Sequence, residues 1–111
     1  MSGEETEVIA FRMTAVEGQI ALYRKRHDEI WPELEAALRA AGVLEYRIFN
    51  EPGSHDLFAV MRRKKAHGLD ALAASPIMRR WWDMMADVTV TGPDGVPLQH
   101  ELRQAYAMKQ F

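Results

Sequence analysis

The chain has 111 residues, of which 48% are hydrophobic and 27% charged, a mix typical of a globular protein. A length of this order has room for one core, so we expect a single domain over residues 1–111, with residues 1–6 as a disordered tail. A net charge of −2 leaves no basic excess to neutralise phosphates, so we expect no nucleic-acid partner.

No apolar run approaches the ~20 residues that span a bilayer, so we expect no membrane-spanning helix and no membrane partner. The first residues are acidic and polar, unlike a secretory signal, and the sequence has no cysteine. The lack of cysteine excludes disulfides, thiolate catalysis and Cys-based metal sites. Together these features favour a cytoplasmic location.

The first predicted element is a strand over residues 8–15. Apolar Ile9, Phe11 and Met13 alternate there with smaller or polar residues, which is the period of a half-buried strand.

The longest amphipathic stretch, residues 19–38, predicts one helix or two helices that meet near Pro32. Proline cannot donate a backbone hydrogen bond, so it fits best in the first turn of a second helix, with a bend between residues 28 and 31. Gly42 tolerates the left-handed conformation and should end that helix.

Tyr23 and His27 lie on the apolar side of this stretch, four residues apart and therefore one above the other. Either both are core residues whose polar atoms find partners inside the protein, or they line a cavity between the helix and the element on which it packs. The hydroxyl of Tyr23 needs a partner in either case.

The remaining elements follow from the hydrophobic period and from the positions of glycine and proline. They are strands over 43–51 and 56–62 joined by a turn, helices over 65–74 and 76–88, a loop over 91–95 and a strand over 102–110. Ser75 and Pro76 form an N-cap followed by proline at the first helical position.

This order predicts an α+β fold of the ferredoxin-like type, in which a four-stranded antiparallel sheet carries helices on one face. The other face of the sheet would still be half apolar, because Phe49, Phe58 and Val60 occur on both sides of the hairpin. An apolar face of this size should not stay in water. We therefore expect two sheets to pack face to face in a homodimer.

Acid–base chemistry is the reaction type that the sequence favours. No two of the four histidines stand at a metal-ligand spacing, and the phosphate-binding, dinucleotide-binding and nucleophile-elbow motifs are absent. Histidine carries protons near neutral pH, and His27 is the histidine placed on an apolar face. His55, His67 and His100 stand in turns or polar settings and are interpreted as surface residues.

Two further aromatic features belong with this helix. Trp81 and Trp82 point about 100° apart on a helix, so one should pack inward while the other flanks an opening. Such a pair either packs in the core and in the dimer interface, or it stacks on the C–H faces of a sugar. Tyr46 is either another core aromatic or a hydroxyl that points into the same cavity as Tyr23.

Several segments are together specific enough to indicate a family. They are YRKRH at 23–27, IWPEL at 30–34, YRIF at 46–49, RWWDMM at 80–85, PDG at 93–95 and EL at 101–102. In combination they resemble the L-rhamnose mutarotase family, over about residues 8–108. The sequence departs from the family pattern in acidic residues at 28–29, and in Phe49 and Met84, where tyrosine is common.

The resemblance implies a ferredoxin-like domain that forms homodimeric α/β barrels and interconverts the α and β anomers of L-rhamnose without cofactor or metal. It also implies that His27 is the catalytic proton donor. The sugar-contacting positions of the family correspond to Tyr23, Tyr46, Trp81 and Trp82.

The chemistry of mutarotation suits such residues, because opening a hemiacetal needs one group that gives a proton and one that accepts it. We expect protonated His27 to be the acid at the ring oxygen, with Tyr23 orienting the sugar or the imidazole. A water molecule or a carboxylate such as Asp83 or Asp87 would be the base. Two other hypotheses remain: another cofactor-free enzyme on the same dimeric barrel, such as a small monooxygenase or isomerase, and a non-catalytic sugar-binding module.

Overall fold

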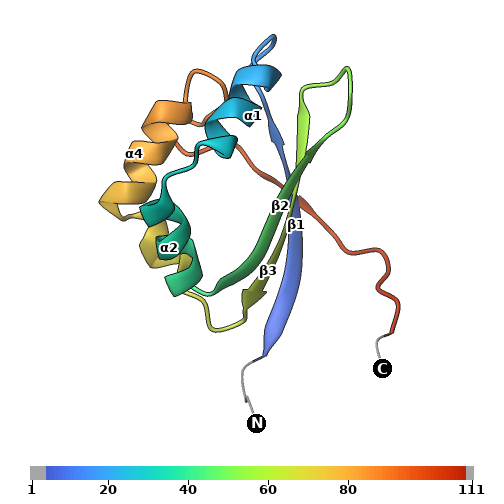
Figure 1. Ribbon diagram of the computed structural model, residues 1–111. Helices are drawn as coiled ribbons and strands as arrows, with labels where there is room; N and C mark the ends of the chain where they lie inside the picture. The colour runs from blue at the N-terminus through green and yellow to red at the C-terminus, as the bar shows by residue number, and fades with distance from the viewer. Residues whose placement is uncertain (1–4, 110–111) are drawn as a thin grey trace.

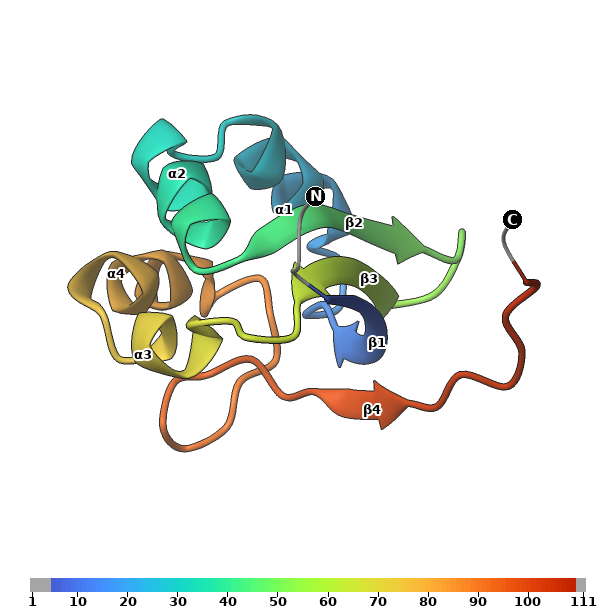
Figure 2. The same cartoon turned by 90° about the horizontal axis from the view of Figure 1, so that it is seen from below.

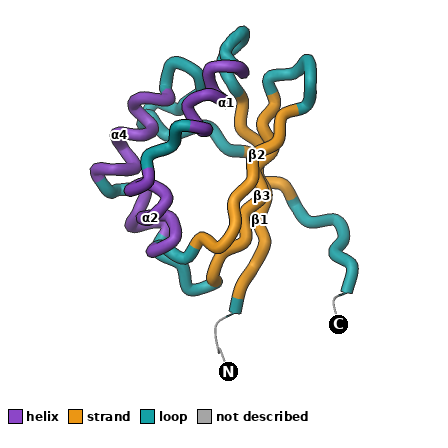
Figure 3. Tube along the Cα trace, in the orientation of Figure 1, coloured by secondary structure: helices purple, strands orange, loops and turns teal. Residues whose placement is uncertain are grey.

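The computed structural model describes residues 5–109, in which one face of a four-stranded antiparallel sheet is covered by a layer of helices (Figures 1 and 3). The strands are β1 (Thr6–Thr14), β2 (Val43–Asn50), β3 (Asp56–Lys64) and β4 (His100–Leu102). The helices are α1 (Ile20–Asp28), α2 (Pro32–Ala40), α3 (Leu69–Ala73) and α4 (Pro76–Met85). The predicted α+β sheet with helices on one face is therefore confirmed. Of the expected tail, residues 1–4 lie outside the described residues, and Thr6 already belongs to β1.

The sheet has the strand order β2-β3-β1-β4, and every neighbouring pair is antiparallel. Phe11 of β1 lies opposite Ala59 of β3, and both side chains are buried against the helices. Because successive side chains of a strand point to opposite faces, their neighbours Ala10 and Val60 point away from the helices. The period-2 pattern of the sequence thus places the core correctly.

The long amphipathic stretch is two helices, α1 and α2, with the bend at the predicted place. The backbone at Trp31 is extended, and Pro32 begins α2 at a position where no amide donor is needed. Gly42 follows the end of α2 with a φ of 107°, a left-handed conformation that glycine adopts without strain.

The helix predicted over 65–74 is shorter than expected, because α3 begins only at Leu69. The amide of Gly68 donates to the carbonyl of Ala41 at 2.7 Å, and the amide of Leu69 donates to Nδ1 of His67 at 3.2 Å. These contacts hold residues 65–68 in a turn against the end of α2. At the next helix, Ser75 caps α4 as predicted, although α4 ends at Met85 rather than near residue 88.

The strand predicted over 102–110 is wrong. The last strand, β4, ends at Leu102, which pairs with Ala10 of β1. Residues 103–109 leave the sheet at this point and extend away from it, on the side opposite the helices (Figures 1 and 2). No described strand lies beside residues 103–109.

The core lies between the sheet and the helices. Its most deeply buried side chains come from each layer, and they include Leu34 of α2, Leu57 of β3 and Val88 after α4. Replacing one of these core side chains by a smaller one lowers the free energy of unfolding, because the transfer free energy of the removed atoms is lost and a cavity is left behind.

We predict that Leu57→Ala, at a side chain that is 2% exposed, lowers the free energy of unfolding by about 2–5 kcal/mol. The matched control is Leu98→Ala, at a side chain that is 44% exposed, which should cost less than about 1 kcal/mol. Urea denaturation followed by circular dichroism measures both. Equal losses for the two variants would contradict this assignment of the core.

Candidate active site

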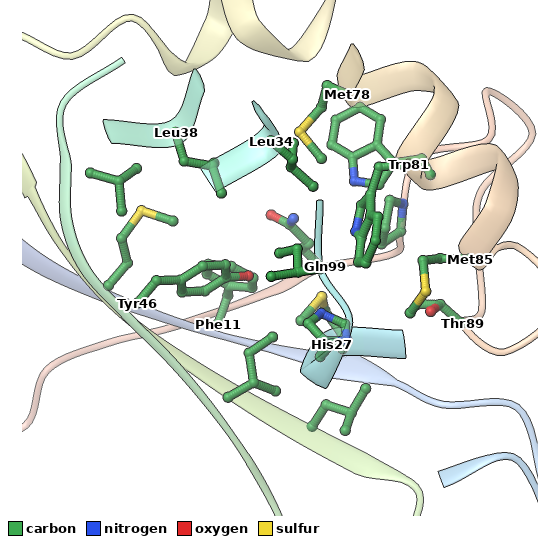
Figure 4. A pocket seen from close by; sticks show the side chains of 18 of the residues that line it. Phe11, His27, Leu34, Leu38, Tyr46, Met78, Trp81, Met85, Thr89 and Gln99 are labelled. Carbon is green, nitrogen blue, oxygen red and sulfur yellow. The ribbon is translucent and has the colours of Figure 1, made fainter. Parts of the chain in front are cut away.

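A cavity of about 1140 Å³ lies between the helical layer and the inner face of the sheet. Its walls are mainly apolar and aromatic, with polar and charged side chains among them, as in small-molecule sites. Tyr23, His27, Tyr46, Trp81 and Trp82, the five residues singled out from the sequence, all line this cavity. Figure 4 shows three of them, His27, Tyr46 and Trp81, around its interior.

His27 is held in one orientation by its own helix. Its Nδ1 lies 3.0 Å from the backbone carbonyl oxygen of Tyr23, one turn earlier in α1. A carbonyl oxygen can only accept, so Nδ1 carries the hydrogen and donates it. The other ring nitrogen, Nε2, makes no hydrogen bond with residues 5–109 and is free to exchange a proton with a ligand.

Aromatic rings support the imidazole on two sides. The ring of Tyr23 lies 4.4 Å from the ring of His27, tilted by 31°, and the indole of Trp81 meets the imidazole edge-on at 5.4 Å. Trp31 in turn packs edge-on against Trp81 at 5.2 Å. In the sequence Trp31 was noted only within the segment IWPEL at 30–34, and the structure shows that it supports Trp81.

Burial lowers the pKa of His27 from its ordinary value of 6.5, because the charged form loses solvation in the half-buried site. The hydrogen bond to Tyr23 and the charge of Asp28 act in the opposite direction but do not cancel this effect. The neutral imidazole is therefore the resting form near pH 7. With Nδ1 protonated, the neutral ring leaves the Nε2 lone pair facing the cavity, whereas the sequence analysis expected a protonated ring.

The two phenols are neutral hydrogen-bonding groups of the same cavity. Burial, and secondly the nearby phenol of Tyr46, raise the pKa of Tyr23 well above its ordinary value. Desolvation raises the pKa of Tyr46 to about 12. Although 38% of Tyr46 is exposed, its hydroxyl points into the cavity (Figure 4). Neither hydroxyl has a hydrogen-bond partner within the described part of the chain, so both can bind a ligand.

The tryptophan pair divides as predicted. Trp81 is buried and reaches the imidazole, whereas Trp82 is half-buried at the wall of the cavity. The guanidinium of Arg79 lies 5.4 Å from the centre of the Trp82 ring, a cation–π contact that restrains this indole.

The carboxylates named as bases do not line the cavity. Asp83 is exposed, and Asp87 is bound by Arg26, with Nη2 and Oδ2 3.1 Å apart. The same guanidinium donates to the carbonyl of Met84 at 2.8 Å, which ties the last turn of α1 to the end of α4. The hydrogen bond from Arg26 lowers the pKa of Asp87. This ion pair positions α1 and leaves Asp87 away from any ligand in the cavity.

Sequence reasoning missed other polar residues of the cavity wall, among them Thr89 and Gln99. Gln99 precedes β4, and its amide reaches into the cavity (Figure 4). Neither carried a signal in the sequence, because each is a single polar residue outside the predicted helices and strands.

Among residues 5–109, no group of three His, Asp or Glu side chains could hold a metal ion. In the same range no helix is long and apolar enough to cross a membrane.

A family model described as L-rhamnose mutarotase matches residues 8–108, nearly the whole chain. The chain belongs to the L-rhamnose mutarotase family. It is 54% identical, over 87% of its length and 92% of the relative, to the L-rhamnose mutarotase of Verminephrobacter eiseniae. It is also 50% identical to that of Burkholderia orbicola, over 93% of this chain and 99% of the relative.

One solved structure of the family agrees with this membership. The crystal structure of an L-rhamnose mutarotase from Formosa agariphila matches with a TM-score of 0.82 and 39% identity, over 93% of this chain and 99% of that one. A Pseudomonas aeruginosa protein matches with a TM-score of 0.55 and 17% identity, over 96% of this chain and 98% of that one. The second similarity concerns the fold alone.

We predict that an NMR titration of the His27 ring gives a midpoint below 6.5, with the Nδ1–H tautomer on the neutral side. Since the pKa is lower in the folded than in the unfolded chain, the unfolded chain binds more protons between the two values. The contribution of His27 to stability is therefore present above pH 6.5 and is lost as the pH falls through the folded pKa. A midpoint above 6.5, or an Nε2–H tautomer, would contradict the geometry.

Proposed function

We propose that this chain interconverts the α and β anomers of L-rhamnose by acid–base opening of the hemiacetal ring, without a cofactor. The observation that carries the proposal is the fixed imidazole of His27, whose Nε2 is free in a cavity lined by the phenols and indoles of Tyr23, Tyr46, Trp81 and Trp82. Membership in the family supports the choice of sugar.

The reaction needs only the movement of one proton between two oxygens on one carbon. Both the anomeric oxygen and the ring oxygen are bonded to C1, so one nitrogen beside C1 can serve both. Neutral His27 accepts the proton of the anomeric hydroxyl at Nε2 while the carbonyl forms and the bond from C1 to the ring oxygen breaks. The imidazolium then gives the proton to the released oxygen, which becomes the free hydroxyl of the open chain.

Rotation about the bond between C1 and C2 presents the other face of the aldehyde, and the same steps in reverse close the ring as the other anomer. During closure the hydroxyl loses its proton to His27, and the new anomeric oxygen receives one. His27 is thus acceptor and donor in turn, which agrees with the proton-donor role implied by the resemblance. The carbonyl of Tyr23 stabilises the imidazolium through the Nδ1–H bond at 3.0 Å.

The remaining side chains hold the sugar rather than move protons. The neutral phenols of Tyr23 and Tyr46 can donate hydrogen bonds to sugar oxygens, since their raised pKa values keep them protonated. The indoles of Trp81 and Trp82 provide apolar faces for the C–H side of the sugar ring. A ligand held between these groups leaves its reacting carbon beside Nε2 of His27.

We also propose that the chain is one ferredoxin-like domain that pairs with a second copy as a dimeric α/β barrel. The strand order β2-β3-β1-β4 supports this fold. The face of the sheet that carries no helix bears apolar side chains that are 37–55% exposed, namely Val8, Phe49, Val60 and Leu102. A second copy of the same face would cover them. Residues 103–109 extend on this side of the sheet, within reach of such a partner (Figure 2).

We further propose a cytoplasmic location, which the lack of cysteine favours.

We predict that the wild-type chain accelerates anomer exchange of L-rhamnose, measured by saturation-transfer NMR, and that His27→Asn lowers this rate by roughly 10²–10⁴-fold. Asparagine keeps a similar size and polarity but cannot accept the proton. The control is His55→Asn, at an exposed histidine in the turn before β3, which should leave the rate unchanged.

Three outcomes separate the hypotheses. Exchange by the wild type together with loss in His27→Asn supports the proposal. Binding of L-rhamnose without acceleration would indicate a sugar-binding module. Neither binding nor exchange would favour another cofactor-free enzyme with an apolar substrate.

We predict a native mass of about twice 12.7 kDa in analytical ultracentrifugation. Val60→Glu places a charge in the middle of the uncovered sheet face and should shift the protein to the monomer. The control, Ala36→Glu, adds the same charge on the exposed side of α2 and should leave the mass unchanged. A monomeric wild type at micromolar concentration would contradict the pairing.

A further inference from the structure

Arg79 is an exposed residue of α4 whose guanidinium makes two contacts just outside the cavity wall. Its central carbon lies 5.4 Å from the centre of the Trp82 ring, and its Nη1 donates to the backbone carbonyl of Asp94 at 3.1 Å. Arg79 itself does not line the cavity. One guanidinium therefore joins an indole of the helical layer to the loop that follows this layer in the chain.

The first contact restrains a residue of the cavity wall. Arg79 and Trp82 stand three residues apart on α4, so their side chains are neighbours on the helix surface. Trp82 is half-buried, packs against the core and lines the cavity. Because Arg79 is exposed, its guanidinium holds the indole from the solvent side and leaves the cavity side of the indole free for a ligand.

The second contact holds the loop over residues 91–97, which belongs to the segment that leads from α4 to β4 (Figure 2). An antiparallel bridge joins the two ends of this loop, and the amide of Gly92 donates to the carbonyl of Val96 at 2.9 Å. Val96 lines the cavity, whereas Asp94 lies at the tip of the loop. The hydrogen bond from Arg79 thus fastens the tip of a cavity-lining loop to α4.

We propose that Arg79 is a positioning residue for sugar binding, which holds the indole of Trp82 and the 91–97 loop in place relative to each other. The inference rests on the proposed function and extends it to a side chain outside the cavity. Without the guanidinium, the indole and the loop tip would both gain freedom, and a bound sugar would have to order them again. Ordering costs free energy, so binding would be weaker.

The same reasoning separates binding from the chemical step. His27 is oriented by the carbonyl of Tyr23 within α1, and Arg79 takes no part in that hydrogen bond. Loss of the Arg79 contacts should therefore raise KM and leave kcat nearly unchanged.

Arginine suits this position better than lysine. Its planar guanidinium can donate a hydrogen bond to a carbonyl while its face lies against an aromatic ring. The ammonium of lysine has the same charge but no plane to stack, so it would replace the two contacts only in part. Arg79→Lys is consequently the informative conservative variant.

The test compares Arg79→Ala and Arg79→Lys with the wild type. For each, KM and kcat of L-rhamnose anomer exchange are measured by NMR, the Kd by calorimetry and the Tm by circular dichroism. The indole N–H signal of Trp82, assigned by its loss in Trp82→Phe, reports the ring contact in nitrogen–proton correlation spectra. Arg80→Ala is the matched control, because it removes the same charge from the next exposed position, which does not line the cavity.

We expect Arg79→Ala to raise KM and Kd by about three- to tenfold, the size typical of one cation–π contact and one hydrogen bond, with kcat within about twofold. Arg79→Lys should lie between Arg79→Ala and the wild type. The indole signal of Trp82 should move in Arg79→Ala and stay in place in Arg80→Ala, which should also match the wild type in KM.

Unchanged KM and Kd in Arg79→Ala, with or without a lower Tm, would overturn the positioning role while wild-type exchange still supports the proposed function. An equal rise of KM in Arg80→Ala would overturn it in favour of a general effect of charge. If the wild type neither binds nor exchanges L-rhamnose, the proposed function fails, and the sugar-binding role of Arg79 fails with it. An indole signal that does not respond to Arg79→Ala would refute the restraint on Trp82 in either case.

Discussion

The hydrogen bond from Nδ1 of His27 to the carbonyl of Tyr23 is the contact on which the site depends. It spans one turn of α1, so the helix that carries the imidazole also orients it. Because it uses Nδ1 as a donor, it decides which nitrogen faces the cavity and which tautomer the neutral ring adopts. Without it the ring could rotate, and the position of the basic lone pair would no longer be defined.

The rest of the fold keeps this helix turn in place. The break before Pro32 lets α1 and α2 cross the sheet as two short helices, and it brings Trp31 against Trp81. Trp81 then supports the imidazole from the side of α4. Arg26, the residue before His27, binds both the end of α4 and Asp87 from the outside. Packing inside the cavity and an ion pair outside it thus fix the same turn.

Much of this arrangement could be predicted from the sequence, because local rules determine it. The period of apolar residues identified β1 and the two helices, and Pro32 identified the bend. The spacing of Tyr23 and His27 placed them on one face, although it could not decide between core and cavity. The boundaries that failed depend on contacts between distant segments. A strand was predicted over residues 102–110, but pairing requires a neighbour, and the chain turns away from β1 after Leu102.

The charge state of His27 also could not be predicted from the sequence. The lowered pKa of His27 arises from the side chains that surround it in three dimensions, and these come from separate elements. Asp83 and Asp87 stood close to the tryptophans in the sequence, yet neither lines the cavity. Thr89 lies between two valines and looks like an ordinary residue of an extended segment, and only the fold shows that it lines the cavity.

The most direct test of the central claim is a crystal structure of the protein with L-rhamnose bound. The account predicts that Nε2 of His27 lies within about 3.2 Å of the anomeric or ring oxygen, while Nδ1 remains bonded to the carbonyl of Tyr23. A sugar bound elsewhere in the cavity, or an imidazole that has left the Tyr23 carbonyl to meet the sugar with Nδ1, would contradict it.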